Sequence, residues 1–263
     1  MSVVEQIRDF WDADAATYDL DPGHHPRGEL QRAAWRAALE DLLPPAPARV
    51  LDVGAGTGFV TLLAAELGHE MTAVDISPRM LARLRQKAAS SQLTVNAIEA
   101  DAAAVPAGPF DAVVSRHLLW TLVDPVAALA AWRAVSPHGV LVLIDRDWGT
   151  ESPAVALRRL GRRALDRIRS TPPTHHGTYA PEVVRALPLV GGAGPADLLS
   201  LVAKAGWVSP RIRRLPDLDW AMKYGQPWTE RLTAEAPHLA VVAAASPGSK
   251  EQSGSGETRT AAS

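Results

Sequence analysis

A buried strand that breaks into three closely spaced glycines constrains the fold of this chain most. The strand is the apolar run Val50–Val53, and the glycines are Gly54, Gly56 and Gly58. Glycine has no Cβ and tolerates positive φ, so such a turn lets the backbone come close to a ligand. The helix expected after the turn presents free N–H groups and its positive dipole end. The segment therefore predicts a strand, a turn and a helix that together bind an anionic ligand group.

Short β-branched runs alternate with helical patterns through the first 150 residues. The expected strands are Arg49–Val53, Glu70–Asp75, Thr94–Ile98, Ala112–Ser115 and Val140–Ile144. The expected helices between them are Thr57–Leu67, Pro78–Ala89 and Pro125–Val135, two of which begin with proline at its favoured first-turn position. This alternation predicts an α/β fold with a doubly wound parallel sheet and helices on both faces.

The two ends of the chain add elements to this core. Apolar spacing predicts helices at 3–11 and 29–43 around a loop at 19–28, which together form a helical cap over 1–45. The main domain spans 46–245, with an insertion at about 151–190 that contains a basic helix (153–170) and a loop (171–179). A helix at 195–205 and closing strands at 207–215 and 238–245 complete it. Residues 246–263 are Ser- and Gly-rich, and we expect them to be disordered.

Composition excludes several classes of protein. The chain has 263 residues, 47% of them hydrophobic, which is enough for a single domain with a sizeable core. A net charge of −2 gives no reason to expect nucleic acid as a partner, and without cysteine there is no thiol chemistry. No signal peptide or membrane-spanning run is apparent, so we expect a cytoplasmic protein.

A carboxylate at the end of the next strand narrows the ligand. Asp75 follows the glycine turn by about 20 residues, where nucleotide-binding βαβ units place the acid that holds ribose hydroxyls. A dinucleotide G-x-G-x-x-G motif requires glycine where Phe59 stands. The pattern Asp52-x-Gly-x-Gly-x-Gly58 instead resembles motif I of class I S-adenosylmethionine-dependent methyltransferases. The resemblance implies a seven-stranded, mostly parallel sheet with its last strand antiparallel, and S-adenosylmethionine as cofactor with S-adenosylhomocysteine as product.

The resemblance also implies a set of cofactor-binding residues. They are Tyr18, Asp52, Gly54, Ala55, Gly56, Asp75, Ile76, Asp101, Ala102, Arg116 and His117. By analogy with the family, the glycine loop faces the methionine moiety and Asp75 accepts both ribose hydroxyls. Asp101 meets the adenine amino group, the Ala102 N–H meets a ring nitrogen, and Tyr18 of a W-x(n)-Y-D signature approaches the cofactor carboxylate.

Candidates for catalysis and for the acceptor come after the fourth strand and from the cap and insertion. Arg116 and His117 lie where the sulfonium is expected, and His117 is either a general base or a packing residue. The expected acceptor-binding residues are His24, His25, Trp120, Trp148, His175, His176 and Tyr179. Asp145 and Asp147 suggest a Mg²⁺ site, but the further acid that catechol-type enzymes use is absent after the fourth strand, so we expect no metal.

These observations favour one function over two others. Ser115-Arg-His-Leu118 replaces the Asn/Asp-Pro-Pro-Tyr/Phe stretch typical of enzymes that methylate nucleic-acid bases and protein amides. We therefore expect N- or O-methylation of a small molecule, of the kind found in natural-product and antibiotic biosynthesis, by a monomer or homodimer with no nucleic-acid or membrane partner. The alternatives are an NAD(P)-dependent oxidoreductase and a non-catalytic cofactor-binding scaffold.

Overall fold

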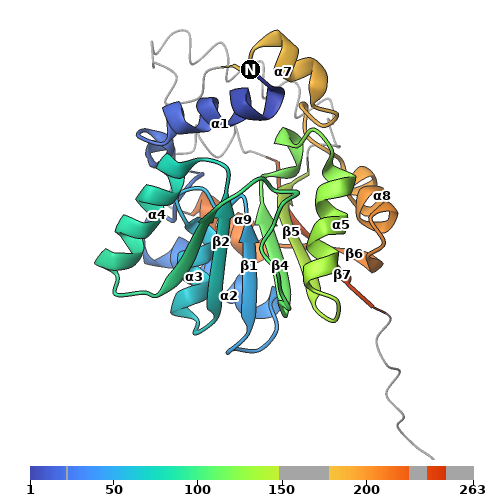
Figure 1. Ribbon diagram of the computed structural model, residues 1–263. Helices are drawn as coiled ribbons and strands as arrows, with labels where there is room; N and C mark the ends of the chain where they lie inside the picture. The colour runs from blue at the N-terminus through green and yellow to red at the C-terminus, as the bar shows by residue number, and fades with distance from the viewer. Residues whose placement is uncertain (22, 148–177, 225–235, 247–263) are drawn as a thin grey trace, which may run out of the picture.

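The computed structural model describes residues 1–21, 23–147, 178–224 and 236–246, and places a seven-stranded sheet at their centre (Figure 1). The strands are β1 (Arg49–Val53), β2 (Glu70–Asp75), β3 (Val95–Glu99), β4 (Ala112–Arg116), β5 (Val140–Arg146), β6 (Val208–Arg214) and β7 (His238–Ala244). Each predicted strand is present, with ends within two residues of the expected ones. The β-branched and apolar runs that predicted the strands therefore form the buried sheet.

The order of the strands confirms the predicted topology. The order is β3-β2-β1-β4-β5-β7-β6, with parallel pairing from β3 to β5 and antiparallel pairing of β7 with both β5 and β6. The chain moves outward from β1 to β3 and returns to β4 on the other side of β1. Open α/β sheets bind ligands at such a switch point, beyond the carboxyl ends of the strands.

Helices cover both faces of the sheet. They are α1 (Val3–Asp14), α2 (Glu29–Leu42), α3 (Phe59–Glu66), α4 (Pro78–Ser90), α5 (Pro125–Val135), α7 (Pro181–Ala186), α8 (Pro195–Lys204) and α9 (Pro216–Lys223), with one-turn 3₁₀ helices η1 (Tyr18–Leu20) and η2 (Leu119–Thr121). Trp35, Leu63 and Leu218 anchor α2, α3 and α9 in the core on one face. Trp132 and Leu198 anchor α5 and α8 on the other face. The sheet is thus doubly wound, as predicted.

Local sequence signals determine where several helices begin. Ser77 accepts a hydrogen bond from the Met80 N–H and caps α4, and Asp124 caps α5 through the Ala127 N–H. Helix α3 begins at Phe59, two residues later than expected. The preceding Gly58 has φ +92°, which is not a helical conformation, so the helix cannot include it. The short helices α7 and α9 were not predicted, since six and eight residues carry little periodicity.

The N-terminal helix α1 lies across the carboxyl ends of the strands (Figure 1). It contacts α4 and α7, so it links the βαβ core to the segment that follows the insertion. None of the described helices has the length and apolarity to span a bilayer. The expected basic helix 153–170 and the expected disordered residues 247–263 lie outside the described residues.

Candidate active site

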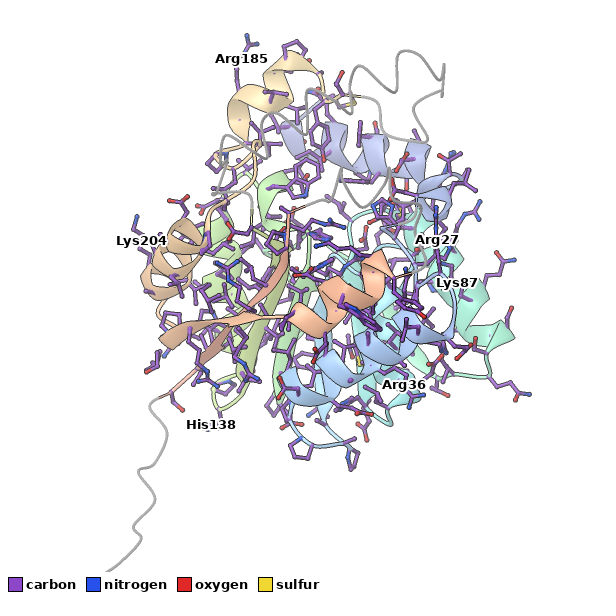
Figure 2. The ribbon with its side chains drawn as sticks, turned by 180° about the vertical axis from the view of Figure 1, so that it is seen from behind. Arg27, Arg36, Lys87, His138, Arg185 and Lys204 are labelled. Carbon is purple, nitrogen blue, oxygen red and sulfur yellow. The ribbon has the colours of Figure 1, made fainter. Side chains whose placement is uncertain are left out.

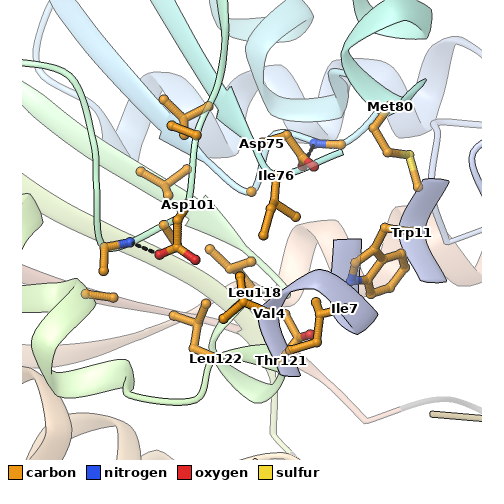
Figure 3. Close-up of a pocket in the computed structure, with 18 of the residues that line it drawn as sticks. Val4, Ile7, Trp11, Asp75, Ile76, Met80, Asp101, Leu118, Thr121 and Leu122 are labelled. Carbon is orange, nitrogen blue, oxygen red and sulfur yellow. Dashed lines mark hydrogen bonds between the residues drawn. The ribbon is translucent and has the colours of Figure 1, made fainter. Parts of the chain in front are cut away.

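A cavity of about 240 Å³ opens at the switch point between β1 and β4. Its walls come from the ends of β1, β2 and β4 and from the loops after β3 and β4, and α1 covers it with Val4, Ile7 and Trp11. In the view of Figure 3, Asp101 lies at one end of the cavity and Trp11 at the other, with Asp75 and Ile76 between them. The cavity therefore joins the cap to three of the predicted cofactor-binding elements.

The glycine turn forms part of the cavity wall, and its three glycines, Gly54, Gly56 and Gly58, all have positive φ. Gly54 has φ +73°, and a Cβ there would lie 2.7 Å from the Leu118 Cδ1 atom. The N–H groups of Gly54 and Ala55 both donate to the Val74 carbonyl, at 2.8 and 3.0 Å. Gly54 and Gly56 line the cavity, whereas Ala55 does not. Any larger residue at Gly54 would push the turn away from the loop after β4.

Asp75 places a buried carboxylate on the cavity. Its oxygens accept hydrogen bonds from the Gly56 N–H at 2.7 Å and the Ser77 N–H at 2.9 Å. Burial raises the pKa of Asp75 to about 6, against the opposing effect of these bonds. Each carboxylate oxygen has a further lone pair, so the group can accept two hydroxyls of a ribose.

Asp52 has a different position from the one that the sequence suggested. Its carboxylate is buried away from the cavity and accepts the Thr61 hydroxyl at 2.6 Å. Burial raises the pKa of Asp52 to about 6, while the Thr61 bonds oppose the rise. The residue fastens β1 to the first turn of α3 and supports the glycine turn from behind.

The loop after β3 forms the far end of the cavity. Asp101 lines it and accepts the Ala103 N–H at 2.7 Å (Figure 3). Ala102 lines the cavity next to Asp101, and Leu118 and Leu122 add apolar side chains on that side (Figure 3). An apolar end of the cavity with one carboxylate at its edge suits a purine base that carries an exocyclic amino group.

His117 lies on the cavity wall in an uncommon backbone conformation. Its φ is +55°, a region that few residues other than glycine adopt. The backbone N–H donates to the Ile144 carbonyl at 3.1 Å, and the ring Nδ1 lies 3.0 Å from the Asp145 Oδ1 atom. Burial and the charge of Arg116 lower the pKa of His117. We infer a neutral imidazole that donates from Nδ1 to Asp145 and keeps a lone pair on Nε2.

The two acids at the end of β5 face different partners. Asp145 bonds to His117, whereas the Asp147 Oδ2 atom lies 2.7 Å from the Arg214 Nη1 atom. Within the described residues, no group of three His, Cys, Asp or Glu side chains could hold a metal ion. The pairing of Asp145 with His117 was missed at the sequence level, because Asp145 was considered only as a Mg²⁺ ligand.

Aromatic side chains join the cap to the loop after β4. Tyr18 lines the cavity, and its ring stacks on His24 with 3.8 Å between centroids. The Tyr179 ring packs 5.7 Å from Trp120, and its hydroxyl bonds to Thr121, which lines the cavity. His24, Trp120 and Tyr179 thus contact residues of the cavity wall without lining the cavity themselves, and His25 does not line it either. The predicted Trp148, His175 and His176 lie outside the described residues.

Comparison with known proteins identifies the family. A family profile described as "Methyltransferase domain" matches residues 51–143. The chain is 34% identical to a demethylmenaquinone methyltransferase of Thermus thermophilus, over 66% of this chain and 80% of that protein. It is 37% identical to a ubiquinone biosynthesis O-methyltransferase of Xanthomonas axonopodis, over 64% of this chain and 67% of that protein. The chain belongs to the class I S-adenosylmethionine-dependent methyltransferases.

A solved structure extends this likeness to the fold of this methyltransferase. Magnesium protoporphyrin IX methyltransferase from Synechocystis, with bound S-adenosylhomocysteine, matches with a TM-score of 0.56 at 16% identity, over 92% of this chain and 99% of that one. The cofactor of this chain is S-adenosylmethionine, which supplies a methyl group from a positively charged sulfur. The cavity fits that cofactor: Asp75 can accept ribose hydroxyls, and the apolar end at Asp101 suits adenine.

Proposed function

We propose that this methyltransferase methylates a hydroxyl oxygen of a small-molecule acceptor, and that His117 removes the hydroxyl proton. The observation that carries the proposal is the His117–Asp145 pair on the cavity wall. Backbone strain persists where the surrounding structure enforces it, and it concentrates at functional sites. A residue that only filled space would need neither the positive φ nor a carboxylate partner.

The chemistry of a hydroxyl explains the need for such a pair. A neutral hydroxyl is a weak nucleophile, and it becomes stronger as its proton moves to a base. The lowered pKa keeps the His117 imidazole neutral at neutral pH, so it can take that proton. Asp145 fixes the ring orientation and stabilises the imidazolium that forms. The rest of the catalysis comes from positioning, because the site holds the acceptor oxygen about 3–3.5 Å from the methyl carbon.

One of the two named relatives supports an oxygen acceptor. It is a ubiquinone biosynthesis O-methyltransferase, whereas the other is a demethylmenaquinone methyltransferase, whose name does not give the methylated atom. In this chain the aromatic rings of Trp120 and Tyr179 pack together, and the Tyr179 hydroxyl bonds to Thr121, which lines the same cavity as His117. We infer that a planar, phenol-like acceptor enters there, past Trp120 and Tyr179. A place for that acceptor in natural-product biosynthesis stays a prediction.

A panel of phenols and catechols, incubated with S-adenosylmethionine labelled in its methyl group, tests this function. Mass spectrometry would detect label in the acceptor and S-adenosylhomocysteine in equal amounts. His117→Gln should lower kcat by about 10²- to 10⁴-fold, the usual contribution of a general base. Asp145→Asn should lower kcat as well, because the imidazole tautomer is no longer fixed.

The pH profile separates a base from a packing residue. The wild-type rate should fall as acid protonates His117, and His117→Gln should lose that limb of the profile. His138→Gln is the matched control, because His138 is an exposed histidine at the opposite edge of the molecule (Figure 2). Full turnover by His117→Gln at every pH would contradict the proposal.

A further inference from the structure

Arg116 is a cation in the cavity wall whose hydrogen bonds are incomplete. Its Nη2 group donates to the Gly23 carbonyl, but its buried Nε has no hydrogen-bond partner. Among the described residues, no carboxylate oxygen lies within 4.0 Å of its nitrogens. A buried donor without a partner usually marks the place of a ligand or a water molecule.

The packing around Arg116 holds the guanidinium but does not neutralise it. The Cζ atom lies 4.0 Å from the centre of the Phe59 ring and 5.2 Å from that of Trp35. Burial, with a smaller effect from the charge of Arg146, lowers the pKa of Arg116 only to about 10, so the group stays charged at neutral pH. Partly burying such a charge is costly unless an anion accompanies it.

The nearby acids have other partners. Asp145 bonds to His117, Asp52 bonds to Thr61, and Asp75 accepts backbone N–H groups. A bound ligand is therefore the fitting source of negative charge. A sulfonium cannot be that ligand group, because a guanidinium repels it, so the sequence-based placement of Arg116 beside the sulfonium is unfavourable.

The glycine turn indicates which anion comes to Arg116. Arg116 and Tyr18 line the same cavity as Asp75, Gly54 and Gly56. The charges of Arg116 and Asp75 both act on the Tyr18 hydroxyl, so Tyr18 lies near both groups. A cofactor with its ribose at Asp75 and its amino-acid arm along the turn can therefore bring its carboxylate to Tyr18 and Arg116. Burial raises the pKa of Tyr18 to about 12, so its hydroxyl remains a donor.

We propose that Arg116 binds the α-carboxylate of S-adenosylmethionine, with its guanidinium plane held against Phe59. Phe59 stands where a dinucleotide motif would have glycine, and here its ring supports the cation that anchors the amino-acid arm. The inference rests on the cofactor of the proposed function and does not depend on the role of His117.

Decarboxylated S-adenosylmethionine provides the test, because it differs from the cofactor only in lacking the carboxylate. Calorimetry would measure binding of both ligands to wild type and to Arg116→Met. Wild type should bind S-adenosylmethionine about 10- to 100-fold more tightly than the decarboxylated form, the range for a hydrogen bond to a charged group. Arg116→Met should bind both ligands equally, with affinity for the decarboxylated form unchanged within about threefold.

Two further variants make the result decisive. Arg185→Met removes an exposed arginine on α7 that points into solvent (Figure 2), and it should keep the wild-type preference. Arg116→Lys keeps the charge and should restore part of the preference if the methionine variant fails to fold. Unchanged affinity of Arg116→Met for S-adenosylmethionine, or equal loss for both ligands, would overturn the inference. Binding is read without turnover, so failure of the proposed acceptor chemistry would appear separately.

Discussion

At the scale of single residues, Asp52 and Asp75 illustrate how one side-chain type takes two roles. Asp52 lies within β1 and Asp75 ends β2, and burial raises the pKa of each to about 6. Only Asp75 lines the cavity. Side chains alternate between the two faces of a strand, and Asp52 faces Thr61 on α3. Sequence reasoning identified both acids but could not separate their faces without the register of the sheet.

The raised pKa of Asp75 predicts that cofactor affinity depends on pH. The ionised carboxylate accepts both ribose hydroxyls, and protonation converts one oxygen to a donor. Affinity for S-adenosylhomocysteine should therefore be full from about one pH unit above the pKa of about 6, fall to about half near it, and approach a tenfold fall per pH unit below it. Calorimetry between pH 5 and 7.5 (roughly the stable range of most domains) would measure the fall.

Two asparagine variants serve as test and control for this dependence. Asp75→Asn should weaken binding by about 1.5–3 kcal/mol at neutral pH and remove most of the pH dependence. Asp52→Asn should keep the pH dependence, since that carboxylate faces α3. A steep acid fall that survives in Asp75→Asn would assign the titration to another group.

At the scale of elements, helix α4 holds the end of the cap helix α1 and the residues that follow it. Asp12 accepts hydrogen bonds from the Ser77 hydroxyl and the Arg79 N–H at the first turn of α4. Further along, Arg83 donates to the Ala16 carbonyl, and the Lys87 Nζ atom lies 2.7 Å from an Asp19 oxygen. Residues 79, 83 and 87 are spaced by four, so they share one face of the helix. Since the Ser77 N–H also donates to Asp75, the cap is fixed to the loop that we propose holds the cofactor ribose.

These contacts predict that the cap controls release of the product. Asp12→Ala removes a carboxylate from the N-terminus of α4, a loss that typically costs about 0.5–2 kcal/mol of stability. We expect a lower free energy of unfolding and faster dissociation of S-adenosylhomocysteine, measured by urea titration and stopped-flow fluorescence. Asp9→Ala is the matched control on the same helix, because among the described residues Asp9 forms its ion pair with the exposed Arg8. Equal dissociation rates for the two variants would contradict a role of the cap in release.

The elements that sequence predicted well are those with strong local signals. The bounds of β1, β2 and α5 are those expected, because β-branched runs and a proline after an Asp cap define them. The pairing of His117 with Asp145 was not predictable, since it joins β4 to β5 across 28 positions. The contact of Asp12 with α4 was not predictable either, because it depends on how the N-terminal helix crosses the sheet.

At the scale of the whole molecule, the cavity proposed for the cofactor is formed by parts that are distant in the chain. Cap helix α1, the glycine turn and the loops after β3 and β4 all line one cavity. Such a ligand binds the folded state and not the unfolded chain, because unfolding separates these parts. Ligand binding must therefore stabilise the entire domain, and the stabilisation should be specific to ligands that fit the cavity.

Thermal unfolding in the presence of different ligands tests this specific stabilisation. S-adenosylhomocysteine at about 100 times its Kd should add about 2.7 kcal/mol to the free energy of unfolding. For a domain of this size, that corresponds to a rise in Tm of roughly 5–10 °C. NADH at the same concentration should leave Tm unchanged, because Phe59 and its neighbouring Arg116 occupy the region where a dinucleotide motif needs glycine. Equal stabilisation by NADH would mean that the cavity accepts a pyrophosphate, and it would revive the oxidoreductase alternative against the family to which the chain belongs.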